Sequence, residues 1–453
     1  MKLSESLKTG GSRPTSSDKE IRTQVDRGTY NTVKSLVHTR LVERLDLASI
    51  SEMPKDTLAT TIRQTLQDIA SSERLPLNRS ERGKLISDLM DEILGLGPIE
   101  SFMADDQIQD VVVNGYGNVF VEKDGVLHRT ATQFRDDDHL MQVIDKIVSK
   151  IGRRVDESSP MVDARLPDGS RVNVIIPPIA LDGPMLSIRK FGQKPLQMDN
   201  LLANQTITPE IAEYLSGAIK TKLNVLVSGG TGAGKTTLLN ILSEYIPTTE
   251  RIVTIEDSAE LRLHQPHVVR LESRPPNIES KGEVTLTDLV KNSLRMRPDR
   301  IIVGETRGAE VLDMLQAMNT GHPGSMSTIH ANSPRDAFAR MEVMIGMSRS
   351  ILSERGARAL IGSAISVIVQ LARLPDGHRR VISVSEVTGL DEDTILTQDI
   401  YVFDQEGVDE KGRIFGSFRS TEASSIFVKH MRTHGVKLSP KVFHLRSPVK
   451  WEA

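Results

Sequence analysis

Residues Asn224 to Thr237 read NVLVSGGTGAGKTT, which is an apolar run, a glycine-rich loop and the first residues of a helical pattern. The loop fits the spacing G-x-x-x-x-G-K-[ST], which arranges backbone N–H groups around a β-phosphate at a helix N-terminus. In that arrangement Lys235 reaches the β- and γ-phosphate oxygens, and the Thr236 hydroxyl binds Mg²⁺. A glycine-rich turn without function is the alternative, but the strand before the loop and the helix after it favour phosphate binding. The residues predicted to bind a nucleoside triphosphate are Gly229, Gly230, Thr231, Gly232, Ala233, Gly234, Lys235, Thr236 and Thr237.

Composition indicates a soluble globular protein of several domains. At 453 residues the chain is too long for one core, and domains of about 100–200 residues predict two to four of them. The net charge of −3 argues against a dedicated nucleic-acid-binding protein, and the absence of cysteine excludes disulfides and thiolate zinc sites. No run approaches about 18 apolar residues, and residues 1–20 lack the apolar core of a secretory signal. We therefore expect a cytoplasmic protein that meets a membrane only through partners.

Changes in periodicity divide the chain into segments. A polar start is followed by apolar residues at helical spacing, such as Val33, Val37 and Leu41. Short apolar runs and turn signals then surround one helical pattern, and strands alternate with helices from the phosphate loop onward. The predicted segments are a disordered tail (1–28), a helical bundle (29–98), an α+β domain (99–192), a linker (193–206) and an α/β domain with a parallel sheet and a C-terminal extension (207–453).

Carboxylates follow two apolar runs downstream of the loop. Residues 251–257 (RIVTIED) end in Glu256 and Asp257, and residues 299–305 (DRIIVGE) end in Glu305. Because parallel strands end at one edge of a sheet, one acid can hold Mg²⁺ through water while another orients the attacking water. Strands also end in acids for turn and capping reasons, but two such ends after a phosphate loop favour a catalytic role. The sequence leaves open whether Glu256 or Glu305 activates water.

A third segment, residues 319–332, is small, polar and rich in glycine. It contains His322 and His330 and precedes a helical pattern over residues 334–345. Its polar groups suit contact with a γ-phosphate, whereas a lone histidine is more often a structural one. We take His330 as a candidate site residue.

Five segments together resemble the type II/type IV secretion ATPase superfamily, and within it the CpaF/TadA-like branch that serves Tad-type pili. They are TIEDSAEL (Thr254–Leu261), RPDRIIVGETRGAE (Arg297–Glu310), MNTGHPGSMSTIHAN (Met318–Asn332), DARLPDGSRVN (Asp163–Asn173) and SIRKF (Ser187–Phe191). The resemblance spans roughly residues 30–445 and implies a RecA-like P-loop ATPase domain that follows a PAS-like α+β domain.

The resemblance also implies roles for individual residues. Glu256 and Glu260 fall in the family's Asp box, and Glu305 falls in its Walker B segment. His322 and His330 fall in its His box. The family's PAS-like domain carries arginines that reach a nucleotide, which corresponds to Arg171 and Arg189 here; surface ion pairs are the alternative role for both.

The implied function is a cytoplasmic homo-hexameric motor that uses ATP and Mg²⁺. Such a motor drives pilus assembly through an inner-membrane platform protein, is peripheral to that membrane and does not bind nucleic acid directly. The alternatives are a type IV secretion ATPase that moves protein or DNA, and a nucleotide-switched scaffold with negligible hydrolysis. Two features depart from the wider family: the tetracysteine zinc module is impossible, and Thr306 stands where an apolar residue is common.

Overall fold

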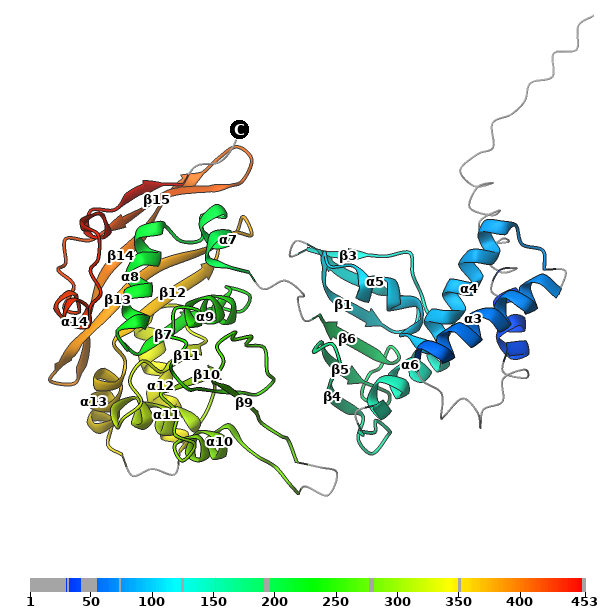
Figure 1. Ribbon diagram of the computed structural model, residues 1–453, viewed down its shortest axis with the longest axis horizontal. Coiled ribbons are helices and arrows are strands. Elements are labelled where there is room, and N and C mark those ends of the chain that lie inside the picture. Colours follow the sequence, from blue (N-terminus) through cyan, green and yellow to red (C-terminus); the bar gives the residue numbers. More distant parts are fainter. Residues whose placement is uncertain are drawn as a thin grey trace, which may run out of the picture. The chain divides into compact units, whose positions relative to one another are not determined.

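The computed structural model describes residues 30, 32–41, 55–72, 75–123, 126–150, 152–190, 196–276, 281–348 and 352–449. They belong to two compact units, one within Met1–Gly192 and one within Gln193–Ala453, and each unit is described by itself (Figure 1). The predicted disordered tail, residues 1–28, lies outside the described residues.

The first unit begins with a small helical bundle. Its helical segments are residues 32–41, α3 (Lys55–Ser72) and α4 (Arg79–Leu94). Leu41, Leu66 and Leu85 are fully buried in the core that these segments share, as their helical spacing predicts. At the start of α4 the Asn78 side chain accepts the N–H of Glu81, and the Glu81 carboxylate accepts the N–H of Asn78. This reciprocal capping fixes where the helix begins.

An antiparallel sheet with one long helix completes the first unit. Its elements are η1 (Gly97–Ile99), α5 (Glu100–Ala104), β1 (Ile108–Asn114), β2 (Val119–Lys123), β3 (Val126–Arg129), α6 (Asp137–Lys150), β4 (Met161–Arg165), β5 (Arg171–Ile175) and β6 (Met185–Arg189). The strand order is β3-β2-β1-β6-β5-β4, and alternate strand residues pack with α6 in one core. The Lys146 ammonium of α6 donates to the carbonyls of Glu92, Ile93 and Gly95 at the end of α4, so α6 is tied directly to the bundle.

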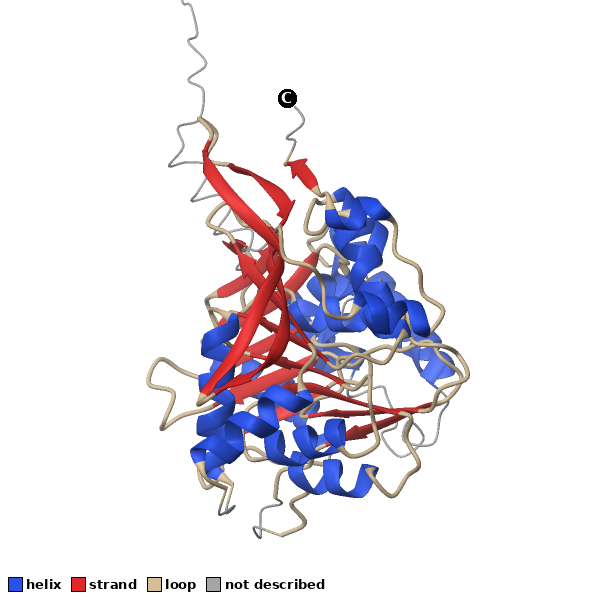
Figure 2. Ribbon diagram, turned by 90° about the vertical axis from the view of Figure 1, so that its left-hand side faces the viewer, coloured by secondary structure: helices blue, strands red, loops and turns tan. Residues whose placement is uncertain are grey.

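The second unit contains one mixed sheet of ten strands, with helices on either side of it (Figure 2). The strand order is β16-β15-β14-β13-β12-β7-β11-β10-β8-β9. The strands are β7 (Val225–Gly229), β8 (Ile252–Glu256), β9 (Val268–Glu272), β10 (Arg300–Thr306), β11 (Met326–Ile329), β12 (Val367–Arg373), β13 (Arg379–Asp391), β14 (Thr394–Val408), β15 (Ile414–Ser420) and β16 (Arg446–Pro448).

The predicted α/β fold is confirmed, with one difference in the sheet. Neighbouring strands are parallel from β9 to β12, as predicted, but β13 to β16 extend the sheet in antiparallel fashion. The chain leaves β12 through a tight turn rather than a helix, with the N–H of Gly377 donating to the carbonyl of Leu374. Gly377 has a φ of +85°, a conformation that glycine adopts without strain.

Helices cover both faces of this sheet. They are α7 (Met198–Ala203), α8 (Pro209–Lys220), α9 (Lys235–Ser243), α10 (Leu286–Ser293), α11 (Glu310–Asn319), α12 (Pro334–Met347), α13 (Glu354–Ala364), α14 (Val428–Thr433) and η2 (Pro440–Phe443). Val225 and Val227 of β7 lie in a core with α8 and α9, whereas Leu226 lies in a second core with α10 to α13. Because successive strand residues point to opposite faces, a continuous apolar run is what a strand buried on both sides requires.

One helix lies where the sequence predicts a linker. α7 falls within residues 193–206, and its Leu201 is buried in the same core as α8 and α9. Met198 and Leu202 pack against this core, because their spacing places them with Leu201 on one helical face. None of the helices that the structure describes is long and apolar enough to cross a membrane.

Candidate functional site

The phosphate loop joins β7 to α9, and its glycines are required for different structural reasons. Gly232 and Gly234 have φ angles of +70° and +94°, which side chains disfavour. A Cβ atom on Gly229 would lie 2.6 Å from the carbonyl oxygen of Leu371 on β12, so only glycine lets the loop start against that strand. The first N–H groups of α9 have no helical acceptor and suit a phosphate.

Lys235 is the first residue of α9 and is largely buried. Its ammonium donates to the carbonyl of Gly230 at 3.0 Å and lies 3.1 Å from Nε2 of His330. Burial lowers the pKa of Lys235, while the nearby carboxylate of Glu305 acts in the opposite direction. A cation held on the loop's own carbonyl can exchange that contact for phosphate oxygens without moving far.

Glu305 of β10 meets His330 at the carboxyl edge of the sheet. Strands β10 and β7 both pair with β11 in parallel, so all three end at this edge. Oε1 of Glu305 lies 3.0 Å from Nε2 of His330, and Oε2 accepts a hydrogen bond of 2.7 Å from Arg307. The Lys235 ammonium therefore contacts the His330 ring, which in turn contacts the Glu305 carboxylate. We call these three residues the Lys-His-Glu cluster.

The His330 ring lies between a cation and an anion. Burial and the charge of Lys235 lower its pKa, whereas Glu305 raises it. A protonated Nε2 donates to Glu305, and an unprotonated Nε2 accepts from Lys235. The imidazole can thus change its partner when the charge beside Lys235 changes, as it does when a phosphate binds.

Glu256 ends β8 and is only 3% exposed. Its Oε2 accepts the backbone N–H groups of Glu260 at 2.7 Å and Leu261 at 3.0 Å. Burial raises the pKa of Glu256 to about 7, although these two hydrogen bonds act in the opposite direction. A Cβ atom on Gly304 would lie 2.8 Å from the Glu256 Cγ, so the glycine before Glu305 makes room for Glu256. Glu256 therefore shapes the loop that follows its own strand.

The residues present fit a nucleotide-bound Mg²⁺ better than a resident metal ion. Among the described residues, no three His, Asp or Glu side chains come together as a metal site. Mg²⁺ commonly takes its ligands from substrate phosphates, water and one or two protein groups. Thr236 lies in the first turn of α9, and Oε1 of Glu256 is buried without a hydrogen-bond partner. The predicted Mg²⁺ ligands, Thr236 and Glu256, stay a prediction.

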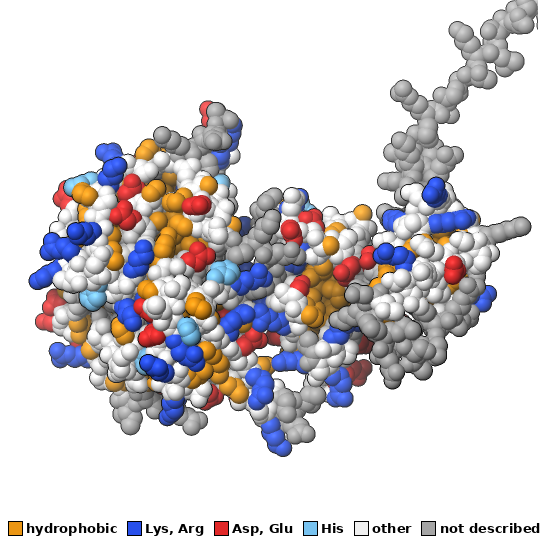
Figure 3. Space-filling model, viewed as in Figure 1, with side chains coloured by type: hydrophobic (Ala, Val, Ile, Leu, Met, Phe, Trp, Pro, Cys, Tyr) orange, Lys and Arg blue, Asp and Glu red, His pale blue; other side chains and the backbone are white. Residues whose placement is uncertain are grey.

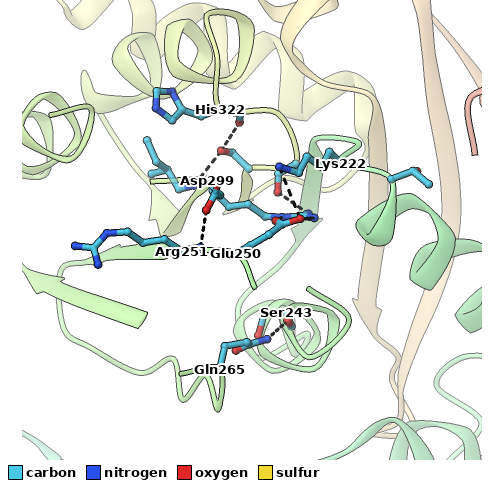
Figure 4. Close-up of polar contacts among 12 residues, drawn as sticks. Lys222, Ser243, Glu250, Arg251, Gln265, Asp299 and His322 are labelled. Carbon is cyan, nitrogen blue, oxygen red and sulfur yellow. Dashed lines mark hydrogen bonds and ion pairs between the residues drawn. The ribbon is translucent and has the colours of Figure 1, made fainter. Parts of the chain in front are cut away.

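His322 does not join the cluster. β11 runs from Met326 to Ile329, so His322 precedes this strand and His330 follows it, at opposite edges of the sheet. Figure 4 shows His322 at the amino edge, in the region of Glu250 and Asp299. The His322 carbonyl accepts from Ser325 at 2.8 Å, and Nδ1 of His322 is buried without a partner. Of the two histidines in the segment, only His330 lies beside Lys235.

Arg171 and Arg189 lie in the first unit on neighbouring strands. They are register partners on β5 and β6, so both side chains leave the same face of the sheet. Asp110 of β1 is the next register partner of Arg189. Burial and a hydrogen bond with Glu122 raise the pKa of Asp110 to about 6, and the charge of Arg189 opposes that shift. The two arginines therefore lie side by side on one face of the sheet, and their contact with a nucleotide stays a prediction.

Four arginines near the loop were not predicted from the sequence. Arg307 contacts Glu305 and lies 3.6 Å from Asp257, and the charge of Arg340 on α12 lowers the pKa of both Lys235 and His330. Arg373 and Arg379 contact the loop from the β12–β13 turn. Arg307 could have been noticed in the sequence, because it lies two positions after Glu305, the acid near the end of an apolar run. The others have no such signal, because their positions depend on how distant segments pack.

The parallel sheet, the loop between β7 and α9 and the Lys-His-Glu cluster define a P-loop protein that binds a nucleoside triphosphate. The family described as "Type II/IV secretion system protein" matches residues 92–415, and the N-terminal domain of type II secretion system protein E matches residues 30–94. The chain belongs to this family of secretion and pilus ATPases.

Individual relatives carry names from conjugation and type IV secretion. A putative conjugal transfer protein of Mycobacterium tuberculosis is 38% identical over 306 residues, which are 66% of this chain and 86% of that protein. The type IV secretion system protein VirB11 of Bartonella quintana is 29% identical over 64% of this chain and 91% of its own length. Among solved structures, the VirB11 ATPase of Brucella suis in complex with sulphate matches 63% of this chain and 94% of its own, with 28% identity and a TM-score of 0.36.

Proposed function

We propose that this chain is a homo-hexameric motor that hydrolyses ATP with Mg²⁺ to drive assembly or disassembly of a Tad-type pilus. The observation that carries the ATPase part is the Lys-His-Glu cluster. In it the ammonium of the phosphate-loop lysine lies 3.1 Å from Nε2 of His330, and this atom lies 3.0 Å from Oε1 of Glu305. In this proposal the loop binds the phosphates, Mg²⁺ neutralises charge on their oxygens, and the cluster borders the γ-phosphate.

We assign water activation to Glu305 rather than Glu256. Glu305 is 21% exposed and contacts His330 and Arg307, which are side chains that can rearrange. Glu256 is nearly buried, and its Oε2 is already occupied by two backbone N–H groups. A base must lie within hydrogen-bond reach of the water that it activates, which favours the more exposed Glu305. Glu256 is proposed to position Mg²⁺ through water.

We further propose that Arg171 and Arg189 complete the nucleotide site of a neighbouring subunit. Their place on one face of the first unit supports this, because paired guanidinium groups suit a phosphate. The chain divides into compact units between Gly192 and Gln193, which supports domain movement about this point during the ATP cycle. On this proposal the α+β domain (99–192) and the ATPase domain (207–453) act as separate bodies joined by the 193–206 segment.

Arg189→Ala is expected to lower ATP turnover by at least about tenfold while ADP binding survives, because the guanidinium stabilises charge that develops in the transition state. Phosphate release and calorimetric ADP binding are the measurements. Arg154→Ala is the matched control, since Arg154 is an exposed arginine of the same unit that pairs with Asp156. Normal turnover in Arg189→Ala would remove Arg189 from the catalytic site.

Two biological processes are candidates for the one that the ATPase drives. The motifs at Thr254–Leu261 and Arg297–Glu310, among others, favour the Tad branch, with an inner-membrane platform protein as partner and a peripheral cytoplasmic location. The names of the relatives favour type IV secretion or conjugal transfer. The net charge of −3 and the interspersed acidic and basic side chains on the face shown in Figure 3 support a motor that does not bind nucleic acid directly.

Complementation separates these pathways. A strain that lacks this chain would receive either the wild type or Glu305→Gln, and surface pili and DNA transfer to a recipient would be scored. We expect pili to return only with the wild type, and DNA transfer to be equal in all strains. Loss of transfer with normal pili would instead establish the secretion function.

A further inference from the structure

The strand order places different side chains on the two sides of the phosphate loop. Neighbouring strands run β10-β11-β7-β12-β13, and the loop follows β7. Glu305 lies near the end of β10, and His330 directly follows β11, so both residues lie on one side of the loop. The turn between β12 and β13 lies on the other side, and it carries Arg373 and Arg379 at its two ends.

Arg379 is bonded to the loop itself. Its Nε donates to the carbonyl of Gly232 at 2.8 Å, and its Cδ lies 3.4 Å from the position of a Cβ on Gly234. The Gly232 carbonyl belongs to the same peptide group as the N–H of Ala233. A cation on that oxygen polarises the peptide and makes the N–H a stronger donor toward the inside of the loop.

Arg373 lies against the same loop and directly opposite Arg379. Its guanidinium Nη1 is 3.7 Å from the position of a Cβ on Gly232, and the two arginines are register partners on β12 and β13. Two guanidinium groups that face each other across two strands can both donate to one phosphate between them. Both side chains are exposed, so they can reach a ligand without a change of the backbone.

The turn that carries these arginines is held in position. The Asp376 carboxylate accepts the N–H of His378 at 3.0 Å within the turn, and it accepts the N–H of Ile414 at the start of β15 at 2.8 Å. At the start of the loop, Gly229 is the register partner of Leu371 on β12. Loop and turn therefore form one supported unit, which is what precise binding of a phosphate requires.

We propose that Arg373 and Arg379 form a nucleotide subsite that binds the α-phosphate, on the side of the loop away from the Lys-His-Glu cluster. The proposal rests on the nucleotide site proposed above. Because the β- and γ-phosphates are directed to Lys235 and the cluster, the α-phosphate and the nucleoside extend to the other side. Planar guanidinium groups bind phosphate oxygens through paired hydrogen bonds.

Calorimetry of the full-length chain with Mg²⁺ and ADP tests this subsite. Arg373→Gln and Arg379→Gln are each expected to raise the Kd for ADP about tenfold, because each loses a charge-assisted hydrogen bond. In turnover assays the KM for ATP should rise by a similar factor while kcat changes by less than about twofold, since the contact is present in both ground and transition states. Arg355→Gln is the matched control, because Arg355 is 76% exposed on α13 and lies 3.9 Å from Asp393.

Thermal unfolding distinguishes ligand binding from a purely structural role. Without nucleotide, Arg373→Gln should leave Tm nearly unchanged, because substitutions of exposed side chains change stability by less than about 0.5 kcal/mol. The rise in Tm that ADP produces should shrink in both variants. An unchanged Kd in both variants, or a lower ligand-free Tm with a normal ADP response, would overturn the subsite. A wild-type chain that binds no ADP would overturn the nucleotide site itself, which is a different result.

Discussion

Glu305→Gln is expected to lower kcat for ATP hydrolysis about 100-fold or more while ADP binding stays within about threefold of the wild type. The substitution keeps the size of the side chain and its ability to accept a hydrogen bond, but it removes the charge. Without that charge the side chain can neither take a proton from water nor hold the ion pair with Arg307 at 2.7 Å. Phosphate release under saturating ATP and calorimetric ADP binding measure the two effects.

Two control variants show whether the effect is specific to Glu305. Glu354→Gln removes an acid that is 88% exposed on α13 and should leave turnover unchanged. Glu256→Gln should reduce turnover less than Glu305→Gln, because an amide oxygen can still accept the N–H groups of Glu260 and Leu261. If the wild type and Glu305→Gln hydrolyse ATP at the same background rate, the chain is a nucleotide-switched scaffold rather than a motor. If Glu256→Gln is the more damaging variant, the two acids have the opposite roles.

Glu250→Ala is expected to be the most destabilising single substitution of a polar residue at the amino edge of the sheet (Figure 4). Arg300 is completely buried, and its Nε lies 2.5 Å from Oε2 of Glu250. Among the described residues, the other acceptor of its guanidinium is the carbonyl of Gly324 at 3.2 Å. Removing Glu250 leaves a buried cation without its counter-ion, which costs about 3–5 kcal/mol and lowers Tm of the second unit by about 10 °C.

Thermal unfolding of two further variants tests the cause. Asp404→Ala breaks an exposed pair with Arg419 and should cost less than about 1 kcal/mol. Combining Glu250→Leu with Arg300→Met should recover most of the stability, because apolar residues of similar volume replace a buried ion pair at little cost. If Glu250→Ala is as mild as Asp404→Ala, then Arg300 finds water or another acceptor, and the pair contributes little to stability.

Sequence reasoning predicted those parts of the site that depend on short segments. The loop at Gly229–Thr237 was recognisable because its glycines and lysine follow a strand and precede a helix. The acid-tipped strands at Glu256 and Glu305 were recognisable because an apolar run followed by a carboxylate is a local pattern. Even so, the sequence could not separate the two acids, since both end strands of the same sheet.

The remaining features depend on contacts between distant segments. Glu256 turns toward the N–H groups of its own following loop, whereas Glu305 meets His330 because β10 pairs with β11. His322 and His330 are close in sequence but lie at opposite edges of the sheet, because β11 carries the chain from one edge to the other between them. The antiparallel extension beyond β12 had a local signal that the prediction did not use, because residues 375–377 (PDG) form a turn that joins two apolar runs without a helix.

The amino-acid sequence by itself determined that this protein has a phosphate loop on an α/β sheet, because that loop needs only particular residues in consecutive positions. Glycines allow the positive φ angles at Gly232 and Gly234, and the helix start supplies the N–H groups. The tertiary structure alone decided which acid, which histidine and which arginines surround the loop. Parallel pairing brings Lys235, Glu305 and His330 to one edge from positions far apart in the chain, and the antiparallel pairing of β13 with β12 adds Arg379 there. Such non-local pairing leaves no local pattern in the sequence.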